Sequence, residues 1–202
     1  MIYQEGINVR DLASYLLNLT KYNSSFAASR GYIYETYATR LLQSGGLFRV
    51  KELDDKKQTN SYKDMTFDSK DVVDFSHSEK DIGAFDDLII NCTDPSKIYK
   101  FTNSTFPTAD LFNPPNNFFQ YTVSSSHTIS KKGALDMCHA CSQLDQINLY
   151  FVIPDDKALE WKYSQSYDDG KNQWKFYNLP VNIQRKLEKI KQFALVLPKP
   201  VS

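Results

Sequence analysis

The second half of the chain alternates between strand-like and helix-like segments, and this alternation constrains the fold more than any other feature. Strands are predicted at residues 109–112, 118–124, 147–153 and 193–197. Helices are predicted between them, at 132–144 and 181–192. The strand predicted at 147–153 is almost entirely apolar, as in a strand covered on both faces. Strands that alternate with helices favour a mixed sheet flanked by helices. We therefore predict an α/β fold.

The first half of the chain is predicted to contain two amphipathic helices followed by a strand. Apolar side chains recur at helical spacing in both helices, and a Gly-Gly pair ends the second one. These three elements are expected at residues 1–24, 25–44 and 47–53. Residues 54–96 form a probable insertion. Its polar run up to Asp71 is a loop or an inserted ribbon, a strand is expected at 71–75, and residues 85–90 are a helix or a strand, with a short helix favoured. A further strand is expected at 97–102.

The composition indicates a single domain with no strong electrostatic preference. A chain of 202 residues, 41% of them hydrophobic, can bury one good core. The 24 basic and 24 acidic side chains give a formal net charge of +0, which argues against attraction of nucleic acid by the whole surface. Three cysteines are too few for a disulfide framework, so reducing conditions are expected. No signal peptide is visible and no segment approaches the roughly 20 apolar residues of a membrane span.

Three polar side chains could meet in such a fold. Glu35 lies at the edge of the apolar stripe of the second helix, and Asp110 and Gln120 lie in two successive strands. Because the short connection at 113–117 contains two prolines, those strands are expected to pair as a hairpin that places Asp110 beside Gln120. The second helix would then pack over the face of Gln120 and bring Glu35 to the same place. The alternative is that all three are ordinary solvated residues.

Two carboxylates and an amide carbonyl are the hard oxygen ligands that Mg²⁺ prefers. A bound ion would polarise a phosphoryl oxygen and lower the pKa of a bound water molecule. A nearby cation normally orients that water and offsets the developing charge. Thr122, which shares a strand face with Gln120, carries no charge, so His127, Lys131 and Lys132 near the start of the next helix are the candidates for that role.

Other motifs are less informative. Cys138-His-Ala-Cys141 has metal-ligand spacing, but it lies within a predicted helix and no second cysteine pair exists, so a core helix is the better interpretation. The basic side of the last helix is expected to be solvated. The aromatic stretch at 161–177 could stack on bases or form a small core or a partner interface. No phosphate-binding loop, nucleophile elbow or dinucleotide-binding glycine motif is present.

Four short motifs occur in a characteristic order, and they resemble a known family. They are Gly31-Tyr-Ile-Tyr-Glu-Thr-Tyr-Ala, Gly45-Gly-Leu-Phe-Arg-Val, Phe119-Gln-Tyr-Thr-Val-Ser-Ser-Ser-His127 and Tyr150-Phe-Val-Ile-Pro154. The combination is similar to the C-terminal module of Crinkler-type effectors and the related retrotransposon hot spot proteins. This resemblance covers residues 25–155 and implies a restriction-endonuclease-like, PD-(D/E)XK fold.

The resemblance also implies a function. The acids of the family fall on Glu35 and Asp110, and its Gln-x-Thr motif falls on Gln120 and Thr122. It implies a nuclease acting on DNA, with Mg²⁺ or Mn²⁺ held by Glu35, Asp110 and Gln120. Thr122 and one of Lys131 or His127 would be the further catalytic residues.

The family pattern departs from the nuclease norm at the usual lysine position, so a second hypothesis is a catalytically inactive module. Such a module would bind DNA or host proteins, alone or as a homodimer. Members of the family are secreted effectors delivered to a host cell, often to its nucleus. A third hypothesis is an interaction domain that uses Trp161 or Trp174 of the aromatic stretch.

Overall fold

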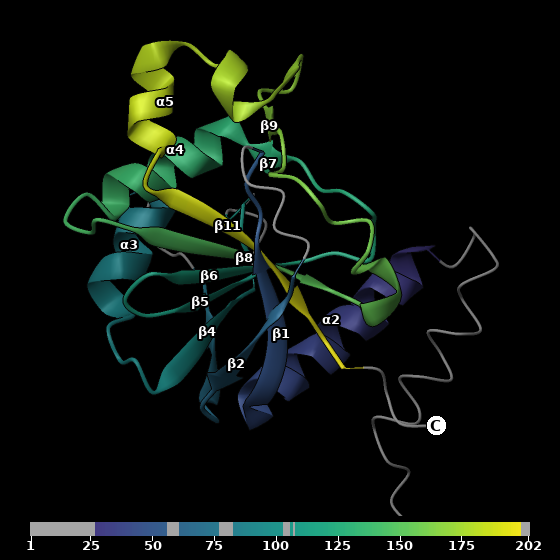
Figure 1. The fold of residues 1–202 in the computed structure, drawn as a ribbon. Helices are drawn as coiled ribbons and strands as arrows, with labels where there is room; N and C mark the ends of the chain where they lie inside the picture. The colour runs from purple at the N-terminus through teal and green to yellow at the C-terminus, as the bar shows by residue number, and fades with distance from the viewer. Residues whose placement is uncertain (1–26, 56–60, 77–82, 103–105, 107, 199–202) are drawn as a thin grey trace, which may run out of the picture.

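The structure is a computed structural model, and it describes residues 27–55, 61–76, 83–102, 106 and 108–198. The helix predicted at 1–24 lies outside the described residues. An eight-stranded sheet forms the centre of the molecule and has helices on both faces (Figure 1). The predicted mixed α/β architecture is therefore confirmed. No helix in the described part of the chain is sufficiently long and apolar to span a bilayer.

The helices and strands alternate along the second half of the chain, as predicted. The α-helices are α2 (Ala27–Ser44), α3 (Ala84–Asn91), α4 (Lys131–Ala140) and α5 (Val181–Leu187). The strands of the large sheet are β1 (Gly46–Glu52), β2 (Lys63–Phe67), β3 (Asp71–Phe75), β4 (Lys97–Phe101), β5 (Leu111–Asn113), β6 (Asn117–Tyr121), β8 (Ile147–Ile153) and β11 (Ile190–Val196). A smaller sheet contains β7 (Ile129–Ser130), β9 (Tyr167–Asp168) and β10 (Gln173–Trp174). Two short 3₁₀ helices, η2 (Asp155–Lys157) and η3 (Phe176–Asn178), complete the fold.

The strand order of the large sheet is β2-β1-β11-β8-β6-β5-β4-β3. At its centre β6, β8 and β11 run parallel to one another, and β3 runs parallel to β4. The remaining neighbours are antiparallel. Parallel neighbours require a crossover connection, and helices α4 and α5 lie in the segments between β6 and β8 and between β8 and β11.

The large sheet is strongly curled. Strands β2 and β3 occupy its opposite edges, yet only residues 68–70 connect them. Four residue steps span at most about 14 Å, so the two edges must approach each other. This connection also packs against the end of α2, where Lys70 N–H donates to Gln43 O at 2.9 Å. Gly45, at φ +66, is required here because a Cβ atom would lie 2.5 Å from Ser69 N.

The concave face of the curled sheet encloses α2. Phe67 of β2 makes edge-to-face contacts with Phe48, Phe119 and Tyr150, with ring centroids 5.6, 6.2 and 5.9 Å away. The buried side chains of this concave core come from α2, from six strands and from Leu197 just after β11: Tyr34, Tyr37, Ala38, Leu41, Leu42, Phe48, Val50, Ile98, Leu111, Phe119, Tyr121, Tyr150, Val152, Leu195 and Leu197. The curl therefore brings residues that are distant in the sequence into one core around a single helix.

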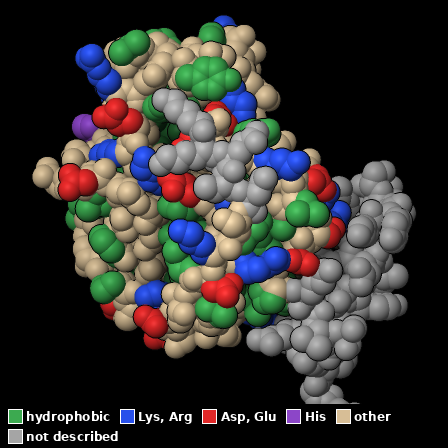
Figure 2. Space-filling view, in the orientation of Figure 1, with side chains coloured by type: hydrophobic (Ala, Val, Ile, Leu, Met, Phe, Trp, Pro, Cys, Tyr) green, Lys and Arg blue, Asp and Glu red, His purple; other side chains and the backbone are tan. Residues whose placement is uncertain are grey.

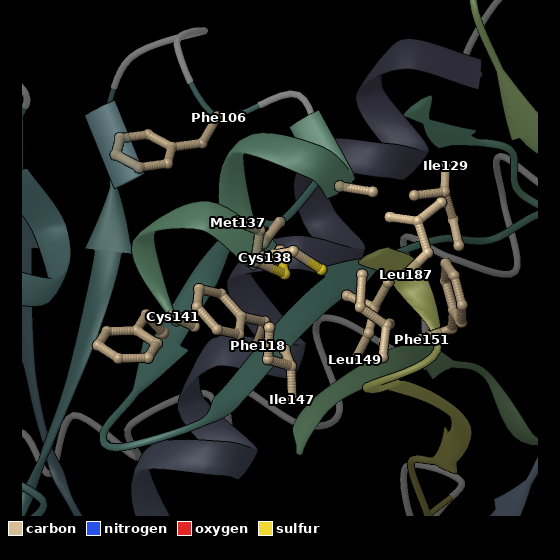
Figure 3. Close-up of a cluster of buried hydrophobic side chains, with 14 of the residues drawn as sticks. Phe106, Phe118, Ile129, Met137, Cys138, Cys141, Ile147, Leu149, Phe151 and Leu187 are labelled. Carbon is tan, nitrogen blue, oxygen red and sulfur yellow. The ribbon is translucent and has the colours of Figure 1, made fainter. Parts of the chain in front are cut away.

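The convex face is covered by α3, α4 and α5 (Figure 1). In this second core Met137 and Cys138 of α4 pack towards Leu149 and Phe151 of β8, with Leu187 of α5 beside them (Figure 3). Helices contact both faces, so β8 is buried along almost its whole length, as its apolar sequence predicts.

Residues 54–96, predicted to be an insertion, contribute the edge strands β2 and β3 and the helix α3. The strand at 71–75 and the short helix are confirmed. The polar run before Asp71 is a loop only in part, because residues 63–67 form β2 along β1, with Gly46 opposite Phe67. Pairing with β1 decides this structure, since the exposed side chains of β2 carry little local strand signal.

The last helix ends earlier than predicted. Its apolar pattern favours a helix over residues 181–192, but α5 ends at Leu187 and Ile190 begins β11. Ile190 lies opposite Ile147 in the parallel β8–β11 pair. The pairing with a fully buried neighbour outweighs the local helical pattern.

Candidate functional site

Asp110 lies immediately before β5 and beside Gln120 of β6. Its backbone N–H donates to Phe119 O at 2.8 Å, so the predicted hairpin is present. The Oδ2 atom of Asp110 accepts two hydrogen bonds, from the Gln120 amide at 2.8 Å and from the Tyr121 backbone N–H at 2.6 Å. The Asp110 carboxylate thus accepts the Tyr121 N–H, which has no β5 backbone carbonyl opposite it because β5 begins only at Leu111. These two donors fix its orientation.

Helix α2 positions Glu35. The Thr39 hydroxyl donates to Glu35 O at 2.8 Å, which leaves the Tyr121 hydroxyl as the donor in the 2.7 Å bond between Thr39 and Tyr121. This buried bond attaches α2 to β6 one turn after Glu35. The exposed Glu35 side chain lies on the edge of the helix that packs into the concave core.

The face that α2 covers differs from the prediction. The sequence predicts that α2 packs over the face of Gln120. In the structure α2 packs with Phe119 and Tyr121, whereas Phe118 belongs to the convex core. Because side chains alternate along a strand, Gln120 lies on the side of Phe118. The prediction is wrong on this point, although Gln120 still reaches Asp110 around the end of β5.

The electrostatics show that the two carboxylates and one cation influence each other. The pKa of Asp110 is raised to about 6, mainly by burial and to a lesser extent by the charge of Glu35. The Tyr121 and Gln120 hydrogen bonds and the ammonium group of Lys100 act in the opposite direction. Although Glu35 is exposed overall, partial desolvation of its carboxylate also raises its pKa, and Lys100 again opposes the shift. Glu35, Asp110 and Lys100 therefore form one interacting group.

Lys100 is the functional candidate that the sequence analysis missed. It lies on β4, where it is opposite Leu111 of β5, and the next residue, Phe101, donates its N–H to Asp110 O at 3.0 Å. Ile98 belongs to the concave core, so alternation places Lys100 on the same side as α2. The sequence predicts a strand at 97–102, in which side chains alternate between the two faces. It does not predict that β4 lies next to Asp110, because that depends on the order of the strands in the sheet.

Thr122 has a structural role. It is buried, its backbone N–H donates to Val152 O at 3.1 Å, and its Oγ1 accepts the Ser124 N–H at 3.1 Å. The hydroxyl group therefore stabilises the turn that follows β6. As its residue type predicts, this position supplies no charge.

His127 and Lys131 lie near the start of α4, and the His127 ring is 6.0 Å from that of Phe151, which is opposite Gln120 in the β6–β8 pair. Lys131 forms an ion pair of 2.7 Å with Asp169. The His127 backbone N–H donates to Gln165 Oε1 at 2.9 Å, and burial lowers the pKa of its imidazole. Both side chains line a groove of about 700 Å³ at the start of α4. Glu35, Asp110 and Gln120 do not line this groove. Of those three, Asp110 is hydrogen-bonded to Gln120, and Glu35 acts on Asp110 through its charge from the opposite side of β6.

The site offers hard oxygen atoms but not a complete ligand cage. Within the described ranges, no group of three or more His, Cys, Asp or Glu side chains could hold a metal ion. Asp110 Oδ1, the Glu35 carboxylate and the Gln120 amide oxygen are the atoms that could face an ion. A Mg²⁺ ion takes few protein ligands and retains several waters, so this sparse set fits that ion.

The other motifs belong to the core. Cys138 and Cys141 are buried free thiols, and burial raises their pKa values to about 11 and about 12. The prediction of a core helix rather than a metal motif agrees with this placement. Trp161 is fully buried and its indole N–H donates to Ser124 O at 3.0 Å. Trp174 is half-buried, with its N–H 3.3 Å from Asp169 Oδ2.

Comparisons of the chain with family models, with curated proteins and with solved structures find no match. The relevant chemistry is a buried, hydrogen-bonded carboxylate next to a second carboxylate and a lysine.

Proposed function

We propose that this chain is a divalent-metal-dependent nuclease module that hydrolyses phosphodiester bonds in DNA. The observation that carries the proposal is the environment of Asp110. Its carboxylate is held by Gln120 and the Tyr121 N–H, and the charge of Glu35 acts on it from helix α2. A carboxylate held by an amide, with a second carboxylate within electrostatic range, supplies the hard oxygen ligands that a Mg²⁺ or Mn²⁺ site uses.

The arrangement of the elements supports a restriction-endonuclease-like, PD-(D/E)XK fold. In that plan an acid-bearing helix precedes a strand aspartate, and an acid or amide follows on the next strand. Here α2 carries Glu35, Asp110 precedes β5 and Gln120 lies on the antiparallel neighbour β6. The parallel strands β8 and β11 then continue the sheet beyond β6.

Each residue has a distinct task in the proposed reaction. The Asp110 carboxylate and Glu35 would bind the ion, and the Gln120 and Tyr121 N–H groups would keep Asp110 in one orientation. When bound, the metal supplies Lewis-acid stabilisation of the phosphoryl group and a more acidic water. Because the pKa of Asp110 is about 6, its carboxylate is mainly ionised only above that pH. Protons therefore compete with the metal ion for Asp110, and the proposed activity should fall in acidic conditions.

An exposed aromatic residue near the acids supports a nucleic-acid substrate. Tyr32 is 73% exposed and lies three residues before Glu35 on α2, so the two side chains are neighbours on the helix surface. An exposed tyrosine can stack on a nucleobase. On the face drawn in Figure 2, Lys and Arg side chains are interspersed with Asp and Glu, so contacts near the site must provide the affinity.

A second candidate function is a catalytically inactive effector module. Gln120 occupies a position where an acid would bind metal directly, and its amide already satisfies Asp110. The Thr122 hydroxyl, at the usual lysine position, is occupied by the Ser124 N–H. In this alternative the fold binds DNA or host proteins, alone or as a homodimer. Secretion and delivery to a host nucleus belong to both proposals and are supported only by the family resemblance.

The decisive experiment is cleavage of plasmid and linear DNA in the presence of Mg²⁺ or Mn²⁺. The wild-type chain would be compared with Asp110→Ala and Glu35→Ala, and Asp136→Ala would serve as a control because Asp136 is an exposed partner of Lys132 on α4. Metal-dependent cleavage that both site variants lose and the control retains is expected. DNA binding without cleavage by the wild-type chain would favour the inactive module. Cleavage that survives both substitutions would reject the proposed site.

A further inference from the structure

We propose that Lys100 is the cation of this site and that its ammonium group binds a non-bridging oxygen of the phosphodiester undergoing hydrolysis. The inference rests on the proposed function and extends it. It assigns the phosphate-binding charge to β4, a strand on which the sequence analysis placed no site residue.

The first support is the position of Lys100 in the sheet. Strand β4 pairs with β5, and the backbone of Phe101 is hydrogen-bonded to Asp110 O. Lys100 is thus one residue away from a direct backbone contact with Asp110. With Ile98, it projects from the concave side of the strand, where α2 carries Glu35. A lysine on a paired strand is held more firmly than one on a loop.

The second support is that Lys100 has no competing partner. In the part of the chain that the structure describes, its ammonium group makes no hydrogen bond or ion pair, and Lys100 is half-buried. By contrast, Lys97 on the same strand pairs with Asp94 at 3.2 Å, and Lys131 pairs with Asp169 at 2.7 Å. Among these lysines, Lys100 alone is both close to the acids and available to an anion.

The third support is charge balance. The ammonium group of Lys100 opposes the pKa increases of both Asp110 and Glu35, so it lies within electrostatic range of the two carboxylates. A phosphodiester carries a negative charge that two carboxylates would repel. A fixed positive charge beside them lowers this repulsion, together with the metal ion.

The chemical step is balanced without any proton transfer by Lys100. The oxygen of a water molecule forms the new bond to phosphorus, and the bond from phosphorus to the leaving sugar oxygen breaks. The attacking water releases a proton to solvent, and the leaving oxygen takes one from solvent. Lys100 stays protonated throughout and interacts with the charge on the phosphoryl oxygens.

The test separates phosphate binding from metal binding. Lys100→Met would be compared with Lys97→Met, a control on the same strand whose ammonium group is used by Asp94. Cleavage rates would be measured over DNA and Mg²⁺ concentrations, and Mg²⁺ affinity would be measured by calorimetry without DNA. We expect Lys100→Met to lose cleavage by a factor on the order of 100, as for removal of a preorganised stabilising group. Its Mg²⁺ affinity should be unchanged or higher, because a repelling charge is gone, and the control should behave as wild type.

A chemical rescue guards against simple misfolding. In Lys100→Cys, alkylation with bromoethylamine rebuilds an ammonium group of nearly the original length. The native Cys92, Cys138 and Cys141 are buried, and burial raises their thiol pKa values to about 11, 11 and 12, so they should react slowly. Recovery of cleavage on alkylation is expected, whereas Lys97→Cys should gain nothing.

Three results would overturn the inference. Cleavage by Lys100→Met at the wild-type rate would remove Lys100 from the mechanism and leave the proposed nuclease intact. A parallel loss of Mg²⁺ affinity would show that Lys100 acts through the metal site rather than on phosphate. Failure of alkylation to restore cleavage in a folded Lys100→Cys protein would show that the charge is not what matters. Absence of cleavage in the wild-type chain would instead reject the proposed function itself, and the role of Lys100 with it.

Discussion

The hydroxyl groups of Thr39 and Tyr121 form a buried hydrogen bond of 2.7 Å that joins α2 to β6. Thr39 lies one turn after Glu35, and the backbone N–H of Tyr121 donates to Asp110. The bond therefore connects the two elements that bring the carboxylates of the candidate site together. Removing it should loosen the site as well as the fold.

Replacing Tyr121 by phenylalanine tests this connection. The change removes only the hydroxyl group, and we expect the free energy of unfolding to fall by about 1 kcal/mol, the usual net contribution of one hydrogen bond. Urea denaturation provides the measurement. Tyr32→Phe is the matched control because Tyr32 is 73% exposed, and it should leave stability unchanged. Equal stability of the two variants would contradict a stabilising role for the Thr39–Tyr121 bond.

Asp110 is predicted to lower stability at neutral pH. Burial raises its pKa to about 6 in the folded protein, whereas an unfolded aspartate titrates near 3.9. Between these values the folded state retains a proton that the unfolded state releases, so the contribution of Asp110 to stability is fully present below pH about 4 and is lost as the pH rises through about 6. This sign is opposite to that of a salt-bridged aspartate.

The variant Asp110→Asn should therefore be more stable than wild type at pH 7. One pKa unit corresponds to about 1.4 kcal/mol, and after a discount for residual exposure we expect a gain of about 2 kcal/mol. The gain should disappear near pH 4, where wild-type Asp110 is protonated. Unfolding curves at both pH values check this, with the exposed Asp136→Asn as the control. A stability difference that does not change with pH would count against the buried carboxylate.

Metal binding should compete with protons at the same carboxylate. Millimolar Mg²⁺ is expected to raise the thermal midpoint of the wild-type protein at pH 7, since a ligand at 100 times its dissociation constant stabilises by about 2.7 kcal/mol. The increase should be smaller below pH 6, where Asp110 is mainly protonated, and it should be absent in Asp110→Asn. Differential scanning calorimetry with and without Mg²⁺ measures both effects. The same midpoint increase in wild type and Asp110→Asn would place the ion elsewhere.

Tyr32→Ala tests the proposed contact with a nucleobase. The loss of one stacked base is expected to weaken DNA binding by about 1–3 kcal/mol, with little change in stability because Tyr32 is 73% exposed. Binding of a labelled oligonucleotide measures the effect. Tyr177→Ala is a suitable control, since Tyr177 is 58% exposed and lies on η3, away from α2. An equal loss in both variants would indicate a general surface effect.

Trp161→Ala should destabilise the whole fold. Trp161 is fully buried against Phe151, with ring centroids 5.0 Å apart, so its removal is expected to cost about 3–5 kcal/mol. Trp174→Ala should cost less because Trp174 is only half-buried. Near-UV circular dichroism and urea denaturation distinguish the two. Loss of partner binding in Trp161→Ala would therefore not by itself identify a binding surface, which weakens the hypothesis of an aromatic interaction domain.

The sequence by itself determined those features whose causes are local. The apolar stripe of α2 repeats with the helical period, and the continuous apolar run of β8 is typical of a strand covered on both faces. Asp110 and Gln120 are only ten positions apart in the sequence, and a short connection with two prolines joins β5 to β6. The resulting hairpin therefore places Asp110 beside Gln120. Short-range pairing leaves few alternatives, so this half of the candidate site could be predicted.

Tertiary structure alone decided the features that depend on which segments become neighbours. Strand β2 exists because β1 offers it an edge, and α2 covers the face of Tyr121 because the curl of the sheet encloses it there. Lys100 joins the site for the same reason. Alternation shows which residues of a strand share a face, but only the strand order places β4 beside Asp110. Strand order is set by the packing of the whole chain, because non-local pairing and burial outweigh the weak local preferences of exposed strands.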